Sequence, residues 1–175
     1  MTINPIRNTL FVTFPRSGHT LLMDCLQEYF GEEMRYCENY HHCNTVPCLD
    51  PATNVQKTHD FDLGVKQEGQ LIIVQTRAKP DALQSWFELR CKWDPDNVGD
   101  WMYPEFIREK GLFYDRWMMK WCTGGSFPVI TYEWFMTHPE MAIAKAVILL
   151  TDDVKVDRSK ISDIVEKMDI KPRRW

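Results

Sequence analysis

Two periodicities of apolar residues alternate along the chain, and together they predict a parallel α/β fold. Continuous apolar segments rich in β-branched residues predict buried strands at 9–14, 71–76 and 127–132, with a shorter strand at 54–59. Apolar residues spaced by three and four predict helices at about 20–30, 80–90, 105–122, 139–150 and 159–168. Strands that alternate with helices are typical of a parallel sheet covered on both faces. We therefore expect a three-layer α/β structure, with residues 1–175 forming a single domain.

The segment from Leu10 to Phe30, LFVTFPRSGHTLLMDCLQEYF, combines a strand, a polar turn and a helix. Pro15 ends the strand, and the turn RSGHT leads into the helix. Free N–H groups and the positive end of the helix dipole favour an anion at such a helix start. Arg16 adds a guanidinium that can bind phosphate or sulfate. The segment predicts an anion-binding turn, with a purely structural turn as the alternative. It is not a Walker A loop, because it has one Gly and no Lys.

Polar residues also follow the other predicted strands. His59, Arg77 and Tyr132 stand at or just beyond the ends of three strands, as Arg16 does after the first. In parallel sheets, ligands bind at the carboxyl ends of the strands. We therefore expect these four side chains to converge on one site.

Composition and charge narrow the class of protein further. A formal net charge of −4 without a long basic run argues against a general nucleic-acid binder, yet it permits a local basic pocket. No apolar run approaches the roughly 20 residues of a membrane span. The N-terminal residues lack the apolar region and cleavage site of a signal peptide. These features predict a soluble, cytoplasmic protein.

Residues 32–54 show no clean period, and an insertion of about twenty residues in a compact domain indicates function. The insertion contains Cys37, His41, His42, Cys43 and Cys48, which are ligand types that zinc uses, but it lacks paired Cys-x2-Cys motifs. A metal site, one disulfide with one free thiol, and free thiols throughout all stay open, and we expect no catalytic metal here. Cys25, Cys91 and Cys122 are expected to be buried thiols.

Four segments resemble the sulfotransferase family. PRSGHT at 15–20 resembles the family's 5′-phosphosulfate loop, usually Pro-Lys/Arg-Ser-Gly-Thr-Thr, with His19 in place of the first Thr. KTH at 57–59 is similar to the segment that carries the catalytic base. TRAKPDALQS at 76–85 is similar to the 3′-phosphate element, in which an Arg and a Ser eight residues later bind the nucleotide. VITYEWFMTHPE at 129–140 is similar to the family's Tyr-Glu segment near the adenine.

This resemblance implies a P-loop NTPase-like sulfotransferase fold and a sulfuryl transfer from 3′-phosphoadenosine 5′-phosphosulfate (PAPS) to a hydroxyl of a small molecule or carbohydrate. The product nucleotide would be adenosine 3′,5′-bisphosphate (PAP), and no metal is required. The implied nucleotide-binding residues are Arg16, Ser17, Gly18, His19, Thr20, Leu21, Arg77, Ser85 and Tyr132. The implied catalytic residues are His59 as general base, with Lys57 and Arg16 stabilising the transferring group.

The chain departs from the family in two ways. The Gly-rich basic segment that usually closes over the 3′-phosphate is missing, so either the basic end Lys171–Arg174 replaces it or the lid is absent. The chain is also short, so the acceptor pocket is either shallow or completed by a second subunit of a homo-oligomer. Two other functions stay open. A small-molecule kinase of the same fold would need a Walker Lys and an acidic magnesium ligand. A non-catalytic nucleotide-binding domain would not need a base at His59.

Overall fold

The computed structural model describes residues 4–66 and 69–171, and a five-stranded parallel sheet forms its centre. The strands are β1 (Thr9–Thr13), β2 (Tyr36–Glu38), β3 (Val55–Thr58), β4 (Leu71–Thr76) and β5 (Val129–Thr131). Their order in the sheet is β2-β3-β1-β4-β5, and every neighbouring pair is parallel. The longest strands are thus central, as expected for apolar segments buried on both faces.

Six α-helices connect and follow these strands in the described part of the chain. They are α1 (His19–Phe30), α2 (Lys79–Trp93), α3 (Tyr103–Cys122), α4 (Tyr132–Thr137), α5 (Pro139–Thr151) and α6 (Arg158–Lys167). Two short 3₁₀ segments, Gly31–Glu33 and Asp100–Met102, precede β2 and α3. Among the described residues, no helix is both long and apolar enough to cross a lipid bilayer.

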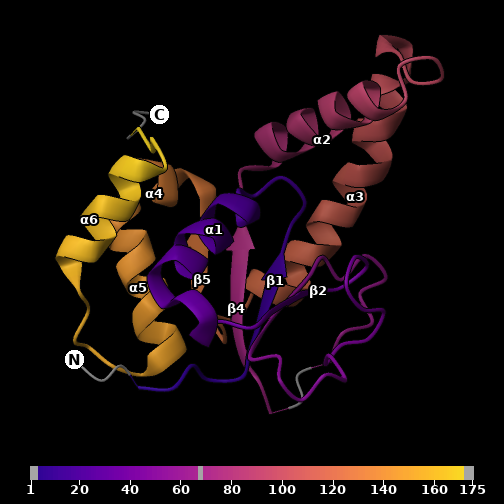
Figure 1. Ribbon diagram of the computed structural model, residues 1–175. Coiled ribbons are helices and arrows are strands. Elements are labelled where there is room, and N and C mark those ends of the chain that lie inside the picture. Colours follow the sequence, from indigo (N-terminus) through magenta and orange to yellow (C-terminus); the bar gives the residue numbers. More distant parts are fainter. Residues whose placement is uncertain (1–3, 67–68, 172–175) are drawn as a thin grey trace.

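The helices cover both faces of the sheet, which confirms the expected layering (Figure 1). On one face, strand residues such as Phe11 and Ile73 pack with α1, α5 and α6. On the other face, their chain neighbours Leu10 and Ile72 pack with α2 and α3, where Trp117 is fully buried. This alternation follows from the two-residue period of a strand.

The layering also places the site. Helix α1 leaves the end of β1 toward one face, whereas α2 leaves the end of the adjacent strand β4 toward the other. Such a divergence opens a crevice at the carboxyl ends of neighbouring parallel strands, where ligands bind in open α/β sheets.

Two elements were missed by the sequence analysis. Strand β2 lies in the segment 32–54 that was expected to be a loop, and α4 directly follows β5. Three-residue β2 is an edge strand whose first and last residues are only half-buried, so it has no apolar run to mark it. The expected role of the basic end 171–174 lies outside the described residues, except for Lys171, which pairs with Asp169 at 3.2 Å.

Candidate active site

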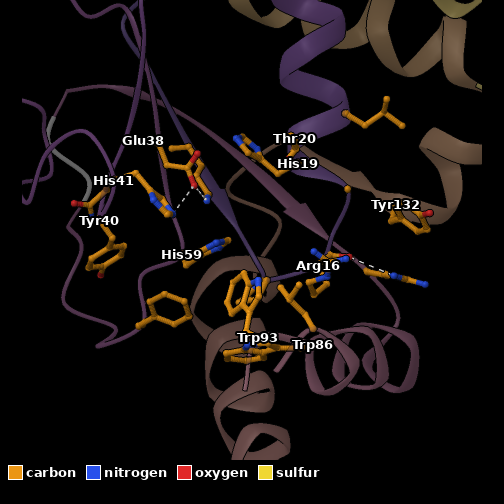
Figure 2. Close-up of a pocket in the computed structure, with 18 residues that line it drawn as sticks. Arg16, His19, Thr20, Glu38, Tyr40, His41, His59, Trp86, Trp93 and Tyr132 are labelled. Atoms are coloured by element: carbon orange, nitrogen blue, oxygen red, sulfur yellow. Dashed lines mark hydrogen bonds and ion pairs between the residues drawn. The ribbon is translucent and has the colours of Figure 1, made fainter. Parts of the chain in front are cut away.

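A cavity of about 640 Å³ opens at the carboxyl ends of the central strands (Figure 2). Nine of the eleven site residues expected from sequence line it: Arg16, Gly18, His19, Thr20, Leu21, Lys57, His59, Arg77 and Tyr132. The other two lie directly behind this lining. Ser17 is buried within the turn, and Ser85 contacts Arg16 from α2. The structure therefore brings together four segments that are far apart in the sequence.

The turn between β1 and α1 has an unusual backbone. Arg16 and Gly18 both have positive φ angles, 67° and 77°. A Cβ atom on Gly18 would lie 2.5 Å from the Tyr132 ring, so only glycine fits beneath that ring. Helix α1 begins at His19 without a side-chain cap, so its first N–H groups are left for a ligand. Free N–H groups at an uncapped helix start favour an anion, so the geometry is compatible with an anion-binding turn.

Two guanidinium groups flank this turn. The Arg16 Nε–H donates to Ser85 Oγ at 3.1 Å, and Arg77 Nη1 donates to the carbonyl oxygen of Arg16 at 3.4 Å. The Arg77 guanidinium also lies over the Tyr132 ring, 4.4 Å from its centroid. The end of β4 is held in turn by Tyr114, whose hydroxyl donates to the Arg77 carbonyl at 2.7 Å. The site thus concentrates positive charge although the chain is acidic as a whole.

Two buried polar atoms beside the turn lack partners. Ser17 Oγ and Arg77 Nε are inaccessible to solvent, and neither is hydrogen-bonded within the described part of the chain. Buried polar groups are nearly always satisfied in folded proteins. Both atoms belong to residues that line or support the turn, so a local shift of the turn or of the Arg77 side chain would be needed to give them a ligand as partner.

The surroundings of His59 determine which of its ring nitrogens carries the proton. Its Nδ1 atom lies 2.7 Å from the Thr13 carbonyl oxygen, which can only accept, so Nδ1 carries the proton. In the neutral ring, Nε2 then keeps a free lone pair, and no described residue hydrogen-bonds to it. Burial and the charge of Lys57 lower the pKa of His59 to about 4. The ring is therefore neutral at physiological pH and able to accept a proton at Nε2.

The backbone around His59 is fixed by α3. The indole N–H of Trp117 donates to the His59 carbonyl at 3.0 Å. The next residue, Asp60, is fully buried and accepts from Lys120 at 2.7 Å and from the Trp121 indole at 2.9 Å. These contacts hold His59 at a defined place on the cavity wall.

Lys57 is not a free cation. Its ammonium forms a close ion pair with Glu38, which also accepts from the Tyr36 hydroxyl at 3.1 Å. Burial lowers the pKa of Lys57, although the pairing with Glu38 opposes this. Burial alone would raise the pKa of Glu38, but its hydrogen bond and attraction to Lys57 lower it instead. Glu38 was missed by the sequence analysis because it lies on the unpredicted strand β2.

The His19 side chain faces the sheet rather than solvent. Its Nδ1 lies 3.3 Å from Gln75 Oε1 and its Nε2 lies 3.0 Å from the Tyr36 hydroxyl. The pKa of His19 lies well below the usual range. Burial is the main cause, and the positive charge of Lys57 lowers the pKa further. The imidazole therefore supports the turn, since Gln75 also donates to the Ser17 carbonyl at 3.0 Å. Any contact of His19 with an anion would come from its backbone N–H.

Aromatic residues form a wall of the cavity next to His59. The sequence analysis did not predict any of them individually. Phe61 lies 5.0 Å from the His59 ring, 5.5 Å from Tyr40 and 6.0 Å from Trp86, measured between ring centroids. Trp93 at the end of α2 also lines the cavity and is 73% exposed. Phe61 follows His59 by two residues, and Trp86 follows Ser85 directly. Their closeness in sequence to the motifs could therefore have identified these two residues as part of the site. This wall can hold the apolar face of a flat molecule or a sugar ring.

A comparison with protein-family models and with curated proteins finds no match to this chain.

Proposed function

We propose that the chain is a sulfotransferase that moves a sulfuryl group from PAPS to a hydroxyl of a small molecule or carbohydrate, on a P-loop NTPase-like sulfotransferase fold. One observation carries the proposal. The anion-binding turn with Arg16, the Arg77–Ser85 pair and the neutral imidazole of His59 meet in one cavity. Each group alone has simpler explanations, but together they supply what the reaction needs.

The donor would be held at its two ends. The N–H groups at the start of α1, with Arg16, would bind the 5′-phosphosulfate, and Arg77 with Ser85 would bind the 3′-phosphate. The unpartnered Ser17 Oγ and Arg77 Nε atoms lie beside these groups, and a ligand would reach them only with a small local shift, because both are inaccessible to solvent. Tyr132 covers Gly18 and lies under Arg77, which suits a contact with the nucleoside.

The chemistry follows from these positions. His59 Nε2 takes the proton of the acceptor hydroxyl while the acceptor oxygen forms a bond to sulfur. The bond between sulfur and the bridging oxygen of the 5′-phosphate breaks, and PAP leaves. Arg16 and the helix N–H groups stabilise the charge that grows on that oxygen. By analogy with phosphoryl transfer, the protein contributes mainly alignment and charge stabilisation.

Lys57 has a narrower role in this proposal than the resemblance implies. It lines the cavity beside His59, but its charge is shared with Glu38. We infer that Lys57 acts from within this pair, keeping His59 neutral and adding positive potential near the sulfuryl group. The acceptor would lie against Phe61, Trp86 and Trp93, which line the same cavity as His59.

A kinase is the second candidate, and the cavity lining argues against it. Magnesium in kinases is bound by carboxylates next to the substrate phosphates. Glu38 is the only acidic residue among those described that line the cavity, and it is paired with Lys57. No lysine occupies the turn at 15–20.

Product analysis tests the proposal. The protein is incubated with PAPS and a pool of phenols and sugars, and in parallel with ATP, magnesium and the same pool. We expect PAP and a sulfated acceptor in the first mixture and no ADP above background in the second. Formation of ADP without PAP would assign the kinase function instead.

A further inference from the structure

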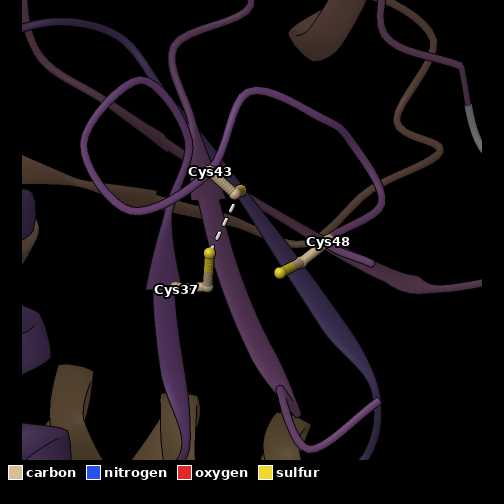
Figure 3. Close-up of side chains that lie close together, drawn as sticks. All are labelled: Cys37, Cys43 and Cys48. Atoms are coloured by element: carbon tan, nitrogen blue, oxygen red, sulfur yellow. Dashed lines mark hydrogen bonds between the residues drawn. The ribbon is translucent and has the colours of Figure 1, made fainter. Parts of the chain in front are cut away.

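Three cysteines gather outside the proposed active site. Cys37 lies on β2, Cys43 forms an isolated bridge with Asn39, and Cys48 follows in the loop toward β3. Their sulfur atoms all lie within 4.8 Å of one another, and the Cys37 and Cys43 sulfurs are 3.1 Å apart (Figure 3). All three are free thiols. The two histidines of the same segment do not join them in this group.

The loop that carries two of these thiols is held in place by a buried amide. Gln56 on β3 is only 1% exposed, and its Nε2 donates to the Thr45 carbonyl at 2.7 Å. Its Oε1 accepts from the backbone N–H of Cys48 at 2.9 Å. Cys43 and Cys48 are therefore directed toward Cys37 by contacts that do not involve the sulfurs.

Two of the sulfurs also accept hydrogen bonds. Gln56 Nε2 donates to Cys43 Sγ at 3.4 Å, and the Thr53 hydroxyl donates to Cys48 Sγ at 3.6 Å. Donors of this kind stabilise thiolates and form the usual outer shell of a metal–thiolate site. They are a second feature, beside the clustering, that suits a bound cation. Cys43 Sγ also donates to the Thr45 carbonyl oxygen at 3.4 Å, a thiol contact that zinc binding would end.

We propose that Cys37, Cys43 and Cys48 bind a zinc ion that has a structural role. With a Zn–S distance of about 2.3 Å, tetrahedral geometry separates the sulfurs by roughly 3.8 Å. The observed separations, between 3.1 Å and 4.8 Å, bracket that value. On binding, each thiol releases its proton to solvent and its sulfur donates a lone pair to the ion, with no change of redox state.

The fourth position faces a separate cavity of about 350 Å³, which His42 and Asp50 also line. His42 Nδ1 accepts from the backbone N–H of Glu38 at 3.1 Å, so the proton of the neutral ring is on Nε2 and His42 cannot ligate in this orientation. A water molecule would complete the coordination. His41 belongs to the other cavity, where it lies 3.7 Å from Glu38.

The position of the site suggests what the ion does. Cys37 directly precedes Glu38, and the residues between Cys37 and Cys43 include Asn39, Tyr40 and His41, which line the active-site cavity. An ion at the three thiols would tie β2 and the segment up to Cys43 to the loop around Cys48, and would fix that wall. The inference does not rest on the proposed function, because its test measures metal binding and not transfer.

Metal analysis of protein purified under reducing conditions tests the site. We expect about one zinc per chain, and Co²⁺ in its place should give the intense visible bands and thiolate charge-transfer absorption of a tetrahedral sulfur site. Cys43→Ser and Cys48→Ser should each lose both the zinc and the cobalt spectrum. Cys91→Ser and Cys122→Ser, which replace half-buried thiols elsewhere, should keep them.

A second measurement needs no variant. Zinc should protect Cys37, Cys43 and Cys48 from alkylation in the native protein, and a chelator should remove that protection, with sites mapped by mass spectrometry. The proposal is overturned if reduced protein binds no zinc, if the serine variants of the cluster bind it as well as the wild type, or if protein kept under reductant contains a Cys37–Cys43 disulfide.

Discussion

The protonation of His59 is determined by its neighbours. The Thr13 carbonyl fixes the proton on Nδ1, and burial with the charge of Lys57 lowers the pKa to about 4. A general base must be unprotonated before it can accept a proton, and a neutral imidazole meets this condition at neutral pH. The three-residue segment Lys57 to His59 thus contains both the proposed base and a cation that, after burial, contributes to its low pKa.

Replacing the base should lower turnover and leave nucleotide binding intact. His59→Ala should reduce the transfer rate by about 10²–10⁴-fold, the range of general-base catalysis. Its affinity for PAP should stay near that of the wild type, because the base contacts the acceptor. His41→Ala is the matched control, since this exposed histidine lines the same cavity and should lose little activity. Turnover of His59→Ala within about threefold of wild type would remove His59 from the mechanism.

The pH profile offers an independent check on the same residue. His59 acts in its neutral form, so kcat/KM should be level near neutral pH and fall on acidification through a pKa of about 4. Lys57→Met removes the neighbouring cation, which should raise the pKa of His59 and move this acid limb to higher pH. An acid limb that Lys57→Met leaves in place would contradict the assignment.

At the scale of elements, the β1–turn–α1 unit carries the proposed donor site, and its conformation depends on Gly18. The residue has a positive φ, and the Tyr132 ring from the start of α4 occupies the space that a side chain would need. The turn and α4 are therefore packed against each other through a position that tolerates only glycine.

Gly18→Ala should abolish measurable PAP binding, because the added Cβ displaces Tyr132 and distorts the turn. Gly31→Ala is the matched control, since Gly31 also has a positive φ, of 58°, yet nothing lies within 4 Å of its added Cβ. The backbone strain should cost each variant about 1–3 kcal/mol of unfolding free energy. Calorimetric titration and thermal unfolding separate the two effects. Equal affinities for PAP in both variants would show that the turn does not bind the nucleotide.

The elements of this unit were predictable because their patterns are local. The apolar runs of β1 and β4 and the helical spacing in α1 and α3 stand out in the sequence, and the helix boundaries agree within a few residues. Strand β2 and helix α4 were missed for a shared reason. One has three residues and the other six, so neither is long enough to show a period.

The residues of the site likewise fall into those that the sequence predicts and those that it does not. Arg16, His59, Arg77 and Tyr132 follow recognisable strands, so their convergence was predictable from a parallel sheet. Glu38 and Gln75, which hold Lys57 and His19, were not, because each partnership joins residues far apart in the chain. The aromatic wall was missed similarly, since its members come from three segments. Cys25 is buried as expected, whereas Cys91 and Cys122 are half-buried.

At the scale of the whole molecule, the sheet and α3 hold the active site together through Asp60. This fully buried carboxylate accepts from Lys120 and Trp121 on α3 and from the backbone N–H of Val65. It links the end of β3, where His59 lies, to the helix layer on one face of the sheet. Removal of this anchor therefore tests how strongly the site depends on the rest of the fold.

Asp60→Ala should lower the free energy of unfolding by about 3–5 kcal/mol, because it leaves the partly buried Lys120 without its counterion and Trp121 without an acceptor. Asp115→Ala breaks the more exposed pair with Lys79 and should cost about 1 kcal/mol or less. Urea unfolding of both variants measures the difference. Similar small losses in the two would show that Asp60 does not anchor the layers.

The central claim is that the cavity recognises a nucleotide by a 3′-phosphate and a 5′-phosphosulfate. Calorimetric titration of the wild-type protein with PAP, and separately with ATP and magnesium, tests it without knowledge of the acceptor. PAP should bind at least about tenfold more tightly than ATP, a difference of about 1.4 kcal/mol. Arg77→Ala should weaken the binding of PAP far more than that of adenosine 5′-phosphate, which has no 3′-phosphate. It should thereby remove most of the preference for PAP over ATP. Equal or tighter binding of ATP with magnesium would contradict the account.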